Sequence, residues 1–185
     1  MQLVKEAMEK ISRHVIDVSS SLDSKSIEKL IEELLNAQKI FVFGTGRSGL
    51  VAKAFAMRLM QLGLNVYVIG ETISPPTEKN DLIILVSGSG ETHSVVFAAQ
   101  VCRKIGTKIV GVTSDSNSTL AKYSDLIITL KGGNKYRKNA EWKIAPLGTL
   151  FEITAMVFFD AIVAELMSRK GMEEETLRKR HAIIE

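Results

Sequence analysis

Two glycine-rich segments carry the residue types that bind phosphate, and each directly follows a run of apolar residues. The segments are GTGRSG at 44–49 and SGSGET at 87–92. Glycine lets several backbone N–H groups converge on one anion, a following helix N-terminus adds partial positive charge, and hydroxyls complete the contacts. We therefore predict a phosphate site, although glycine can also serve only the geometry of a tight loop. The expected ligands are Gly46, Ser48, Ser87, Gly88, Ser89 and Thr92, with Arg47 as a forked charge contact to phosphate or sugar oxygens.

The first segment also allows a dinucleotide interpretation. Gly44, Gly46 and Gly49 have the G-x-G-x-x-G spacing, and Glu71 follows the second apolar run near the distance of a ribose-binding acid. A nicotinamide-cofactor site is disfavoured because it would not explain the hydroxyl and acidic side chains of SGSGET. The paired segments favour a single phosphorylated molecule held across two turns.

Short β-rich runs alternate with helical stretches at about 49–62 and 91–105, with a tighter crossing near 72–80. This alternation is typical of an α/β fold with helices on both faces of a parallel sheet. We predict a doubly wound, five-stranded parallel sheet in the order 2-1-3-4-5, which brings both glycine turns to one crevice. The predicted strands are 39–43, 65–69, 81–86, 108–112 and 125–130.

Helices are expected at both ends of the chain. An apolar stripe from Val4 to Leu22 predicts an N-terminal helix that needs a packing partner, and Ser24 is the expected cap of a second helix. A long helix is predicted from Pro146 to Lys170, followed by a charged helix from Glu173 to Ile183. We predict one domain, with a helical arm at 1–37, a βαβ core at 38–130 and C-terminal helices at 146–185.

The composition limits the function classes. The chain has 185 residues and a net charge of +3, which is too small a bias to indicate nucleic acid binding, although basic residues gather between Lys131 and Lys143. Cys102 is the only cysteine and is expected to be a core thiol in a reducing compartment. We see no export signal or membrane-spanning segment and expect a cytoplasmic protein without a membrane partner.

Four segments together resemble one family. FGTGRSG, SGSGET, PLGTLFE and the terminal KRHAIIE are similar to the 6-phospho-3-hexuloisomerases, which have the sugar isomerase (SIS) fold. The resemblance covers the whole chain; Leu147 replaces a common Met, and the basic segment is longer than in some relatives. It implies a cofactor-free isomerase that interconverts D-arabino-3-hexulose 6-phosphate and fructose 6-phosphate through an enediol(ate). It also implies a homo-oligomer, commonly a tetramer.

The resemblance assigns catalytic roles that fit residue chemistry. Glu152 is the expected base, because apolar neighbours would partly desolvate it and raise its pKa; a structural acid near a helix start is the alternative. Three histidines compete for the acid role. His14 is expected to be a surface or interface residue, His93 lies beside the predicted phosphate, and the resemblance favours His181, reaching the site of a neighbouring subunit.

Other functions stay open at this point. A sugar-phosphate-binding SIS module without catalysis is one, and an isomerase of another phosphosugar is a second. An NAD-binding oxidoreductase is the third. The sequence has no His, Cys and Asp cluster at ligand spacing, so no metal is expected.

Overall fold

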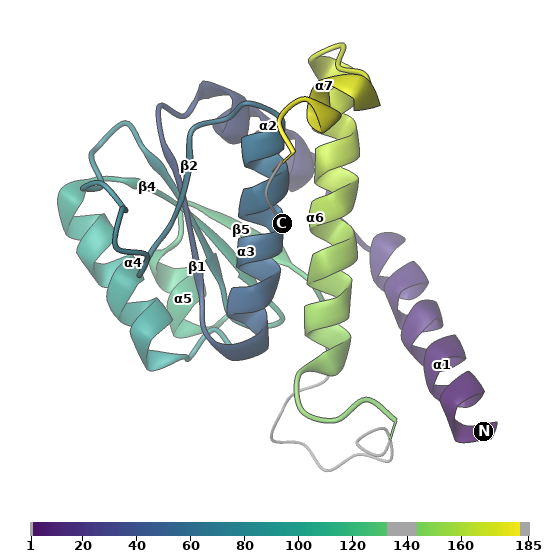
Figure 1. Cartoon of the computed structure of the whole chain (residues 1–185). Helices are drawn as coiled ribbons and strands as arrows, with labels where there is room; N and C mark the ends of the chain where they lie inside the picture. The colour runs from purple at the N-terminus through teal and green to yellow at the C-terminus, as the bar shows by residue number, and fades with distance from the viewer. Residues whose placement is uncertain (1, 133–143, 182–185) are drawn as a thin grey trace.

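The computed structural model of the chain describes residues 2–132 and 144–181. Within these residues a five-stranded sheet runs in the order β2-β1-β3-β4-β5, and all neighbouring strands are parallel (Figure 1). The predicted fold and strand order are therefore confirmed. The strands are β1 (Ile40–Gly44), β2 (Val66–Val68), β3 (Leu82–Val86), β4 (Lys108–Thr113) and β5 (Leu126–Thr129).

Helices cover both faces of the sheet. Helices α3 (Gly46–Gln61) and α6 (Thr149–Arg169) lie side by side on one face, where α2 (Ser24–Asn36) also packs (Figure 1). Helices α4 (His93–Ile105) and α5 (Thr119–Tyr123) pack on the opposite face. This arrangement is the doubly wound architecture that the alternating sequence pattern predicts.

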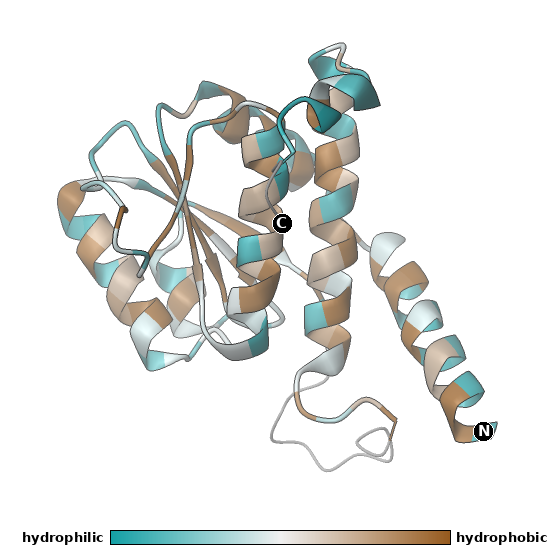
Figure 2. Cartoon of the chain, in the orientation of Figure 1, coloured by the Kyte–Doolittle hydropathy of each residue, from teal (hydrophilic) through white to brown (hydrophobic). Residues whose placement is uncertain are grey.

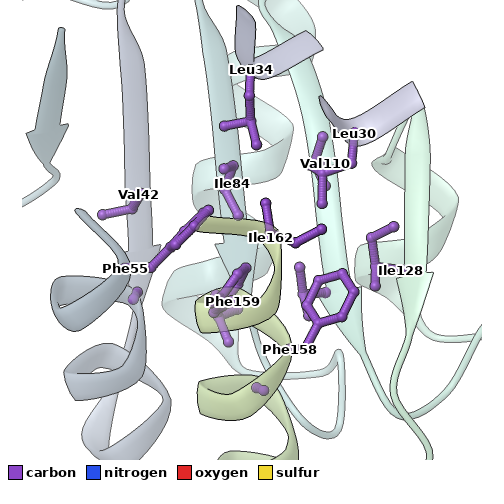
Figure 3. Packing of buried hydrophobic residues seen from close by; sticks show 14 of the residues in the cluster. Leu30, Leu34, Val42, Phe55, Ile84, Val110, Ile128, Phe158, Phe159 and Ile162 are labelled. Carbon is purple, nitrogen blue, oxygen red and sulfur yellow. The ribbon is translucent and has the colours of Figure 1, made fainter. Parts of the chain in front are cut away.

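The two cores follow from strand alternation. In β3 the side chains of Leu82, Ile84 and Val86 belong to the larger core under α3 and α6, whereas Ile83 and Leu85 belong to the core under α4. Hydropathy colouring shows the same apolar strands between helices with mixed surfaces (Figure 2). In the larger core the rings of Phe55 and Phe159 stack with centroids 4.1 Å apart and join α3 to α6 (Figure 3).

The chain reverses its winding between β1 and β3. After β1 it passes into α3 on one face, and after β3 it passes into α4 on the other. The connection at 69–81, which the structure describes throughout, contains no helix and matches the predicted tight crossing. Because β1 and β3 are neighbours whose helices diverge, their carboxyl ends form the crevice in which such sheets bind ligands.

The long C-terminal helix begins later than predicted. Pro146 was expected in its first turn, but α6 starts at Thr149 with Gly148 as its N-cap. The reason is Leu147, whose φ of 58° is left-handed and incompatible with a helix. The backbone N–H of Thr149 and its hydroxyl both donate to the carbonyl oxygen of Pro146 instead. Glu152 consequently lies in the first helical turn, not the second.

The terminal helices also differ in detail. Helix α1 (Gln2–Ser19) packs beside α6, and Asp23, not Ser24, caps α2 by accepting a hydrogen bond from the Ser26 N–H. Ser24 is the first residue of that helix. Helix α7 spans Glu174–Arg178 and so ends earlier than predicted, and its Leu177 is partly buried against the larger core. Ile183 and most of the basic segment 131–143 lie outside the described residues.

Candidate active site

The turn GTGRSG joins β1 to α3 through two close backbone contacts. A Cβ on Gly44 would lie 2.9 Å from the carbonyl oxygens of both Ser48 and Val86, and a Cβ on Gly49 would lie 2.7 Å from the Gly44 oxygen. The first and third glycines of the motif are therefore needed for packing. This is the backbone role that the sequence left as an alternative, and it leaves Gly46 and the first turn of α3 to meet a ligand.

The second turn, SGSGET, is held by its own hydroxyl groups. The Oγ of Ser87 lies 2.9 Å from Oγ1 of Thr92 and accepts a hydrogen bond from the Gly90 N–H at 3.1 Å. The Oγ of Ser89 accepts one from the Glu91 N–H. Ser87 is buried, and Thr92 is the N-cap residue of α4. The hydroxyls predicted to bind phosphate thus lie together at one helix N-terminus.

Phe151 connects the start of α6 to this second turn. A Cβ on Gly88 would lie 2.9 Å from the Phe151 ring, so the ring packs directly on the backbone of the turn. On its other side, a Cβ on Gly132 would lie 2.6 Å from the Phe151 Cβ. Phe151 is 1% exposed. From the sequence, Phe151 is expected only as one of the apolar neighbours of Glu152.

Glu152 is connected to the first turn by an ion pair. The Nε of Arg47 donates to Oε2 of Glu152 at 2.5 Å, and the Glu152 side chain is only 4% exposed whereas that of Arg47 is 58% exposed. The predicted base and the predicted phosphate contact are therefore direct partners. A buried carboxylate that is paired with a residue of the first glycine turn has the position expected of a general base, and this role of Glu152 stays a prediction.

The structure brings most of the predicted site residues to one edge of the sheet. Ser48 lies buried in the first turn of α3, Ser87 is 2% exposed, and Gly46 has a φ of 57°. This edge is formed by the carboxyl ends of β1 and β3 and the N-termini of α3 and α4, and Arg47 links it to the first turn of α6. Glu91 differs from the hydroxyl residues of its turn, because its carboxylate accepts a hydrogen bond from the Thr119 N–H at 2.7 Å, outside the turn.

His181 is not near Glu152 within one chain. The guanidinium of Arg180, the preceding residue, lies against Gly63 just beyond the C-terminal end of α3. Arg47 is at the other end of that helix, about 24 Å away at 1.5 Å per residue. This position favours the arrangement that the family resemblance implies, in which His181 acts at the site of a neighbouring subunit, and that arrangement stays a prediction.

The other two histidines have separate positions. His93 is exposed in the first turn of α4, directly after the second glycine turn. His14 in α1 donates from Nε2 to the carbonyl oxygen of Lys131 at 2.8 Å, a tertiary contact between α1 and the segment after β5. The assignment of the acid to His93 or His181 stays a prediction.

Four further expectations can be compared with the structure. Glu71, the proposed ribose ligand, forms an ion pair with Lys53 at 2.7 Å. Cys102 is buried as predicted, and burial raises the pKa of its thiol to about 11. In the described ranges no group of three or more His, Cys, Asp and Glu side chains is arranged to hold a metal, and no helix there has the length and apolar character to span a bilayer.

Comparison with known proteins identifies the same architecture. Residues 33–162 match the SIS domain family. A Bacillus subtilis protein named 3-hexulose-6-phosphate isomerase is 37% identical over 97% of this chain and 98% of its own length. A Methanocaldococcus jannaschii protein with the same name is 41% identical over 84% of this chain and 82% of its length.

A solved structure extends the likeness to three dimensions. The crystal structure of a Methanococcus jannaschii protein, from which a 3-hexulose-6-phosphate isomerase function was inferred, superposes with a TM-score of 0.85 and 35% identity. The match covers 97% of this chain and 99% of that chain. The likeness therefore includes the terminal helices as well as the sheet.

Proposed function

The chain belongs to the SIS domain family, and we propose that it is a 3-hexulose-6-phosphate isomerase. The proposal is supported by relatives of that name that match nearly the full length of the chain. Its substrate would be D-arabino-3-hexulose 6-phosphate, its product fructose 6-phosphate, and its context a ribulose monophosphate pathway. The relatives are metabolic enzymes, and we infer a cytoplasmic location.

One observation carries the proposal: Glu152 is joined to both glycine turns. Arg47 connects it to GTGRSG, and the neighbouring Phe151 packs on Gly88 of SGSGET. We infer that the turns bind the phosphate through their N–H groups and hydroxyls, at the N-termini of α3 and α4. Glu152 would then face the carbons at the other end of the sugar.

The proposed reaction transfers one proton between adjacent carbons. Glu152 removes the proton from C2 of the 3-ketose, the electron pair forms the C2–C3 double bond, and the C3 carbonyl oxygen gains a proton from the acid. The conjugate base of the acid then takes the O2 proton of the enediol, C2 becomes a carbonyl, and C3 takes the proton back from Glu152, so that both groups return to their starting protonation states. No redox partner enters this balance, and a positioned base typically contributes about 10²- to 10⁴-fold.

The acid of this reaction is proposed to come from a second subunit. We infer this because Arg180, the residue before His181, contacts Gly63 beyond the C-terminal end of α3, whereas Glu152 pairs with Arg47 at the N-terminal end of that helix. Helix α1 leaves Val4 and Met8 largely exposed at 63% and 66%, and both belong to the predicted apolar stripe. We infer that the chain forms a homo-oligomer, a tetramer by likeness to the family, with α1 at an interface.

Deuterium exchange tests the proposed reaction directly. Fructose 6-phosphate is incubated with the protein in deuterated water without cofactor and followed by NMR. The proposal predicts deuterium at C3 and formation of a 3-ketose. Exchange at C1 would indicate an aldose–ketose isomerase instead, and binding without exchange would indicate a sugar-phosphate-binding module. Turnover that appears only with NAD would indicate an oxidoreductase.

A further inference from the structure

The turn between β4 and α5, residues 113–119, makes a set of hydrogen bonds to the second glycine turn. The carbonyl oxygen of Gly88 accepts from the Ser114 N–H at 3.0 Å and from the Ser114 hydroxyl at 2.6 Å. The carbonyl oxygen of Gly90 accepts from the Leu120 N–H at 2.9 Å. The Gly88 carbonyl is therefore oriented by the 113–119 segment, and the Gly90 carbonyl by Leu120 in the first turn of α5 that follows it. The proposed mechanism uses neither of these donors.

These contacts determine which way the turn presents its N–H groups. In a trans peptide the C=O and the following N–H point in opposite directions. Because the Gly88 oxygen is held toward Ser114, the N–H of Ser89 points away from the 113–119 segment. Without those donors, the Gly88 peptide is able to rotate and turn its N–H away from the crevice.

The acid of SGSGET adds a third connection. The Oε1 of Glu91 accepts a hydrogen bond from the Thr119 N–H at 2.7 Å. That hydrogen bond lowers the pKa of the Glu91 carboxyl, as expected for a carboxylate stabilised in its charged form. Glu91 thus bonds the 113–119 segment, whereas Ser87 and Thr92 bond each other on the crevice side.

Close packing reinforces the hydrogen bonds. Gly90 has a φ of 65°, and a Cβ placed there would lie 2.1 Å from Oγ of Ser118 and 2.9 Å from Oγ1 of Thr113. Ser118 and Thr113 are both buried. Ser118 also caps α5 by accepting from the Ala121 N–H, and the Thr113 hydroxyl accepts from the Asp115 N–H. The 113–119 segment is itself ordered by these bonds and forms a fixed support.

We propose that residues 113–119 are a support that orients the phosphate-binding turn, with Ser114 and Glu91 as positioning residues for substrate binding. The inference rests on the proposed function, in that the turn is taken to bind the phosphate of a sugar. Neither residue contacts the reacting carbons in this arrangement. Their loss is expected to weaken phosphate binding while the chemical step at Glu152 is nearly unchanged.

Substitutions that remove the hydrogen bonds of this support are expected to change substrate affinity but not the turnover number. Ser114→Ala and Glu91→Ala are each expected to raise the Kd and KM for fructose 6-phosphate about threefold to tenfold, as the loss of one or two hydrogen bonds implies. The kcat is expected to change by less than about twofold. Glu91→Gln, which keeps an acceptor for the Thr119 N–H, is expected to restore part of the affinity.

Two further variants separate positioning from folding. Thr119→Pro removes the backbone N–H that donates a hydrogen bond to Glu91, and it changes no residue of the SGSGET turn. Proline is suited to this position because Thr119 is the first residue of α5. Ser124→Ala removes a hydroxyl that bonds the Leu120 carbonyl within α5 and does not touch the turn. Thr119→Pro is expected to weaken binding like Glu91→Ala, and Ser124→Ala is expected to leave the Kd unchanged.

Calorimetric titration with inorganic phosphate and with fructose 6-phosphate gives the Kd of each variant. Circular dichroism verifies that each variant is folded. Unchanged Kd values in folded Ser114→Ala, Glu91→Ala and Thr119→Pro would overturn the inference, as would an equal loss in Ser124→Ala. A wild-type protein that binds neither phosphate nor the sugar would also overturn it. If the wild type binds phosphate and fructose 6-phosphate but lacks isomerase activity, the proposed function is wrong. The Kd values of the variants still test whether residues 113–119 orient the turn.

Discussion

Arg47 and Glu152 lie 105 positions apart in sequence and form an ion pair with an Nε–Oε2 distance of 2.5 Å. The pair connects the first turn of α3 to the first turn of α6. Its carboxylate is buried and its guanidinium reaches solvent. The exposed partner can therefore contact a bound anion, while the buried partner is positioned by its helix.

Glu152→Gln is expected to remove the base while retaining size and hydrogen bonding. We expect turnover to fall about 10²- to 10⁴-fold, because the amide does not accept the C2 proton. The Kd for fructose 6-phosphate is expected to stay within about threefold. Steady-state kinetics and calorimetry measure the two quantities, with Glu165→Gln on the exposed side of α6 as control. Full turnover in Glu152→Gln would remove this residue from the mechanism.

The ion pair is also expected to affect stability. Arg47→Met deletes the guanidinium beside a buried carboxylate, and we expect the free energy of unfolding to fall by about 1–3 kcal/mol. Glu152→Gln in the same chain should recover part of this loss, because the charge is then gone. Urea unfolding of the wild type, both single variants and the double variant measures the coupling energy. Strictly additive losses would mean that the two residues do not interact in solution.

Mixing two inactive variants tests the shared site. If His181 acts on a neighbouring subunit, Glu152→Gln and His181→Ala are each expected to be inactive, and their mixed oligomers regain intact sites. Random exchange between two subunits joined by a two-fold axis gives up to about a quarter of wild-type activity. The mixture is assayed after denaturation and refolding together. A mixture as inactive as its components would contradict the shared arrangement.

Helix α1 provides a prediction about assembly. Met8→Glu places a charge on the exposed apolar face of α1 and is expected to lower the molar mass in solution. Sedimentation equilibrium or light scattering gives the mass. Ser12→Glu on the same helix is the control, since Ser12 is exposed but polar. A wild-type chain that is monomeric and active would contradict both this prediction and the role of His181 in a neighbouring site.

Glu91 gives a pH dependence of defined sign. The backbone N–H of Thr119 holds the pKa of Glu91 below its ordinary value of 4.5. A lowered folded pKa contributes stability that is fully present above the unfolded pKa and is lost as pH falls through the folded value. The wild type is therefore expected to be more stable than Glu91→Gln at pH 7, with the difference shrinking as the pH falls below the unfolded pKa and through the lowered folded pKa. Urea unfolding across this pH range checks the expectation, and a difference that does not change with pH would be the contrary result.

The fold was predictable because its information is local. Each strand is a short apolar run, and the stripe that divides β3 between two cores follows from alternation alone. The ends of helices were less predictable. Nothing in the residue type of Leu147 indicates a left-handed φ, and this single residue moved the start of α6 and the helical turn that contains Glu152.

The candidate site was predictable as a list of residues but not as a set of contacts. The glycine turns and Glu152 were named from motifs and family resemblance. The partner of Glu152 was not, because Arg47 has equally good chemistry for a phosphate and only tertiary packing brings the two together. Phe151 has no polar group and no special spacing, so no sequence pattern indicated that its ring packs on Gly88 while its Cβ and backbone pack on Gly132.

The packing of Phe151 on the second glycine turn has a consequence for substrate choice. Its ring packs on Gly88 of the second glycine turn and it belongs to the same helical turn as Glu152. If that turn binds phosphate and Glu152 is the base, this packing holds the two groups at a fixed separation. The distance between the phosphate-binding turn and the Glu152 carboxylate would then be the same for every substrate. We expect the protein to discriminate among phosphosugars by the number of carbons between the phosphate and the carbonyl.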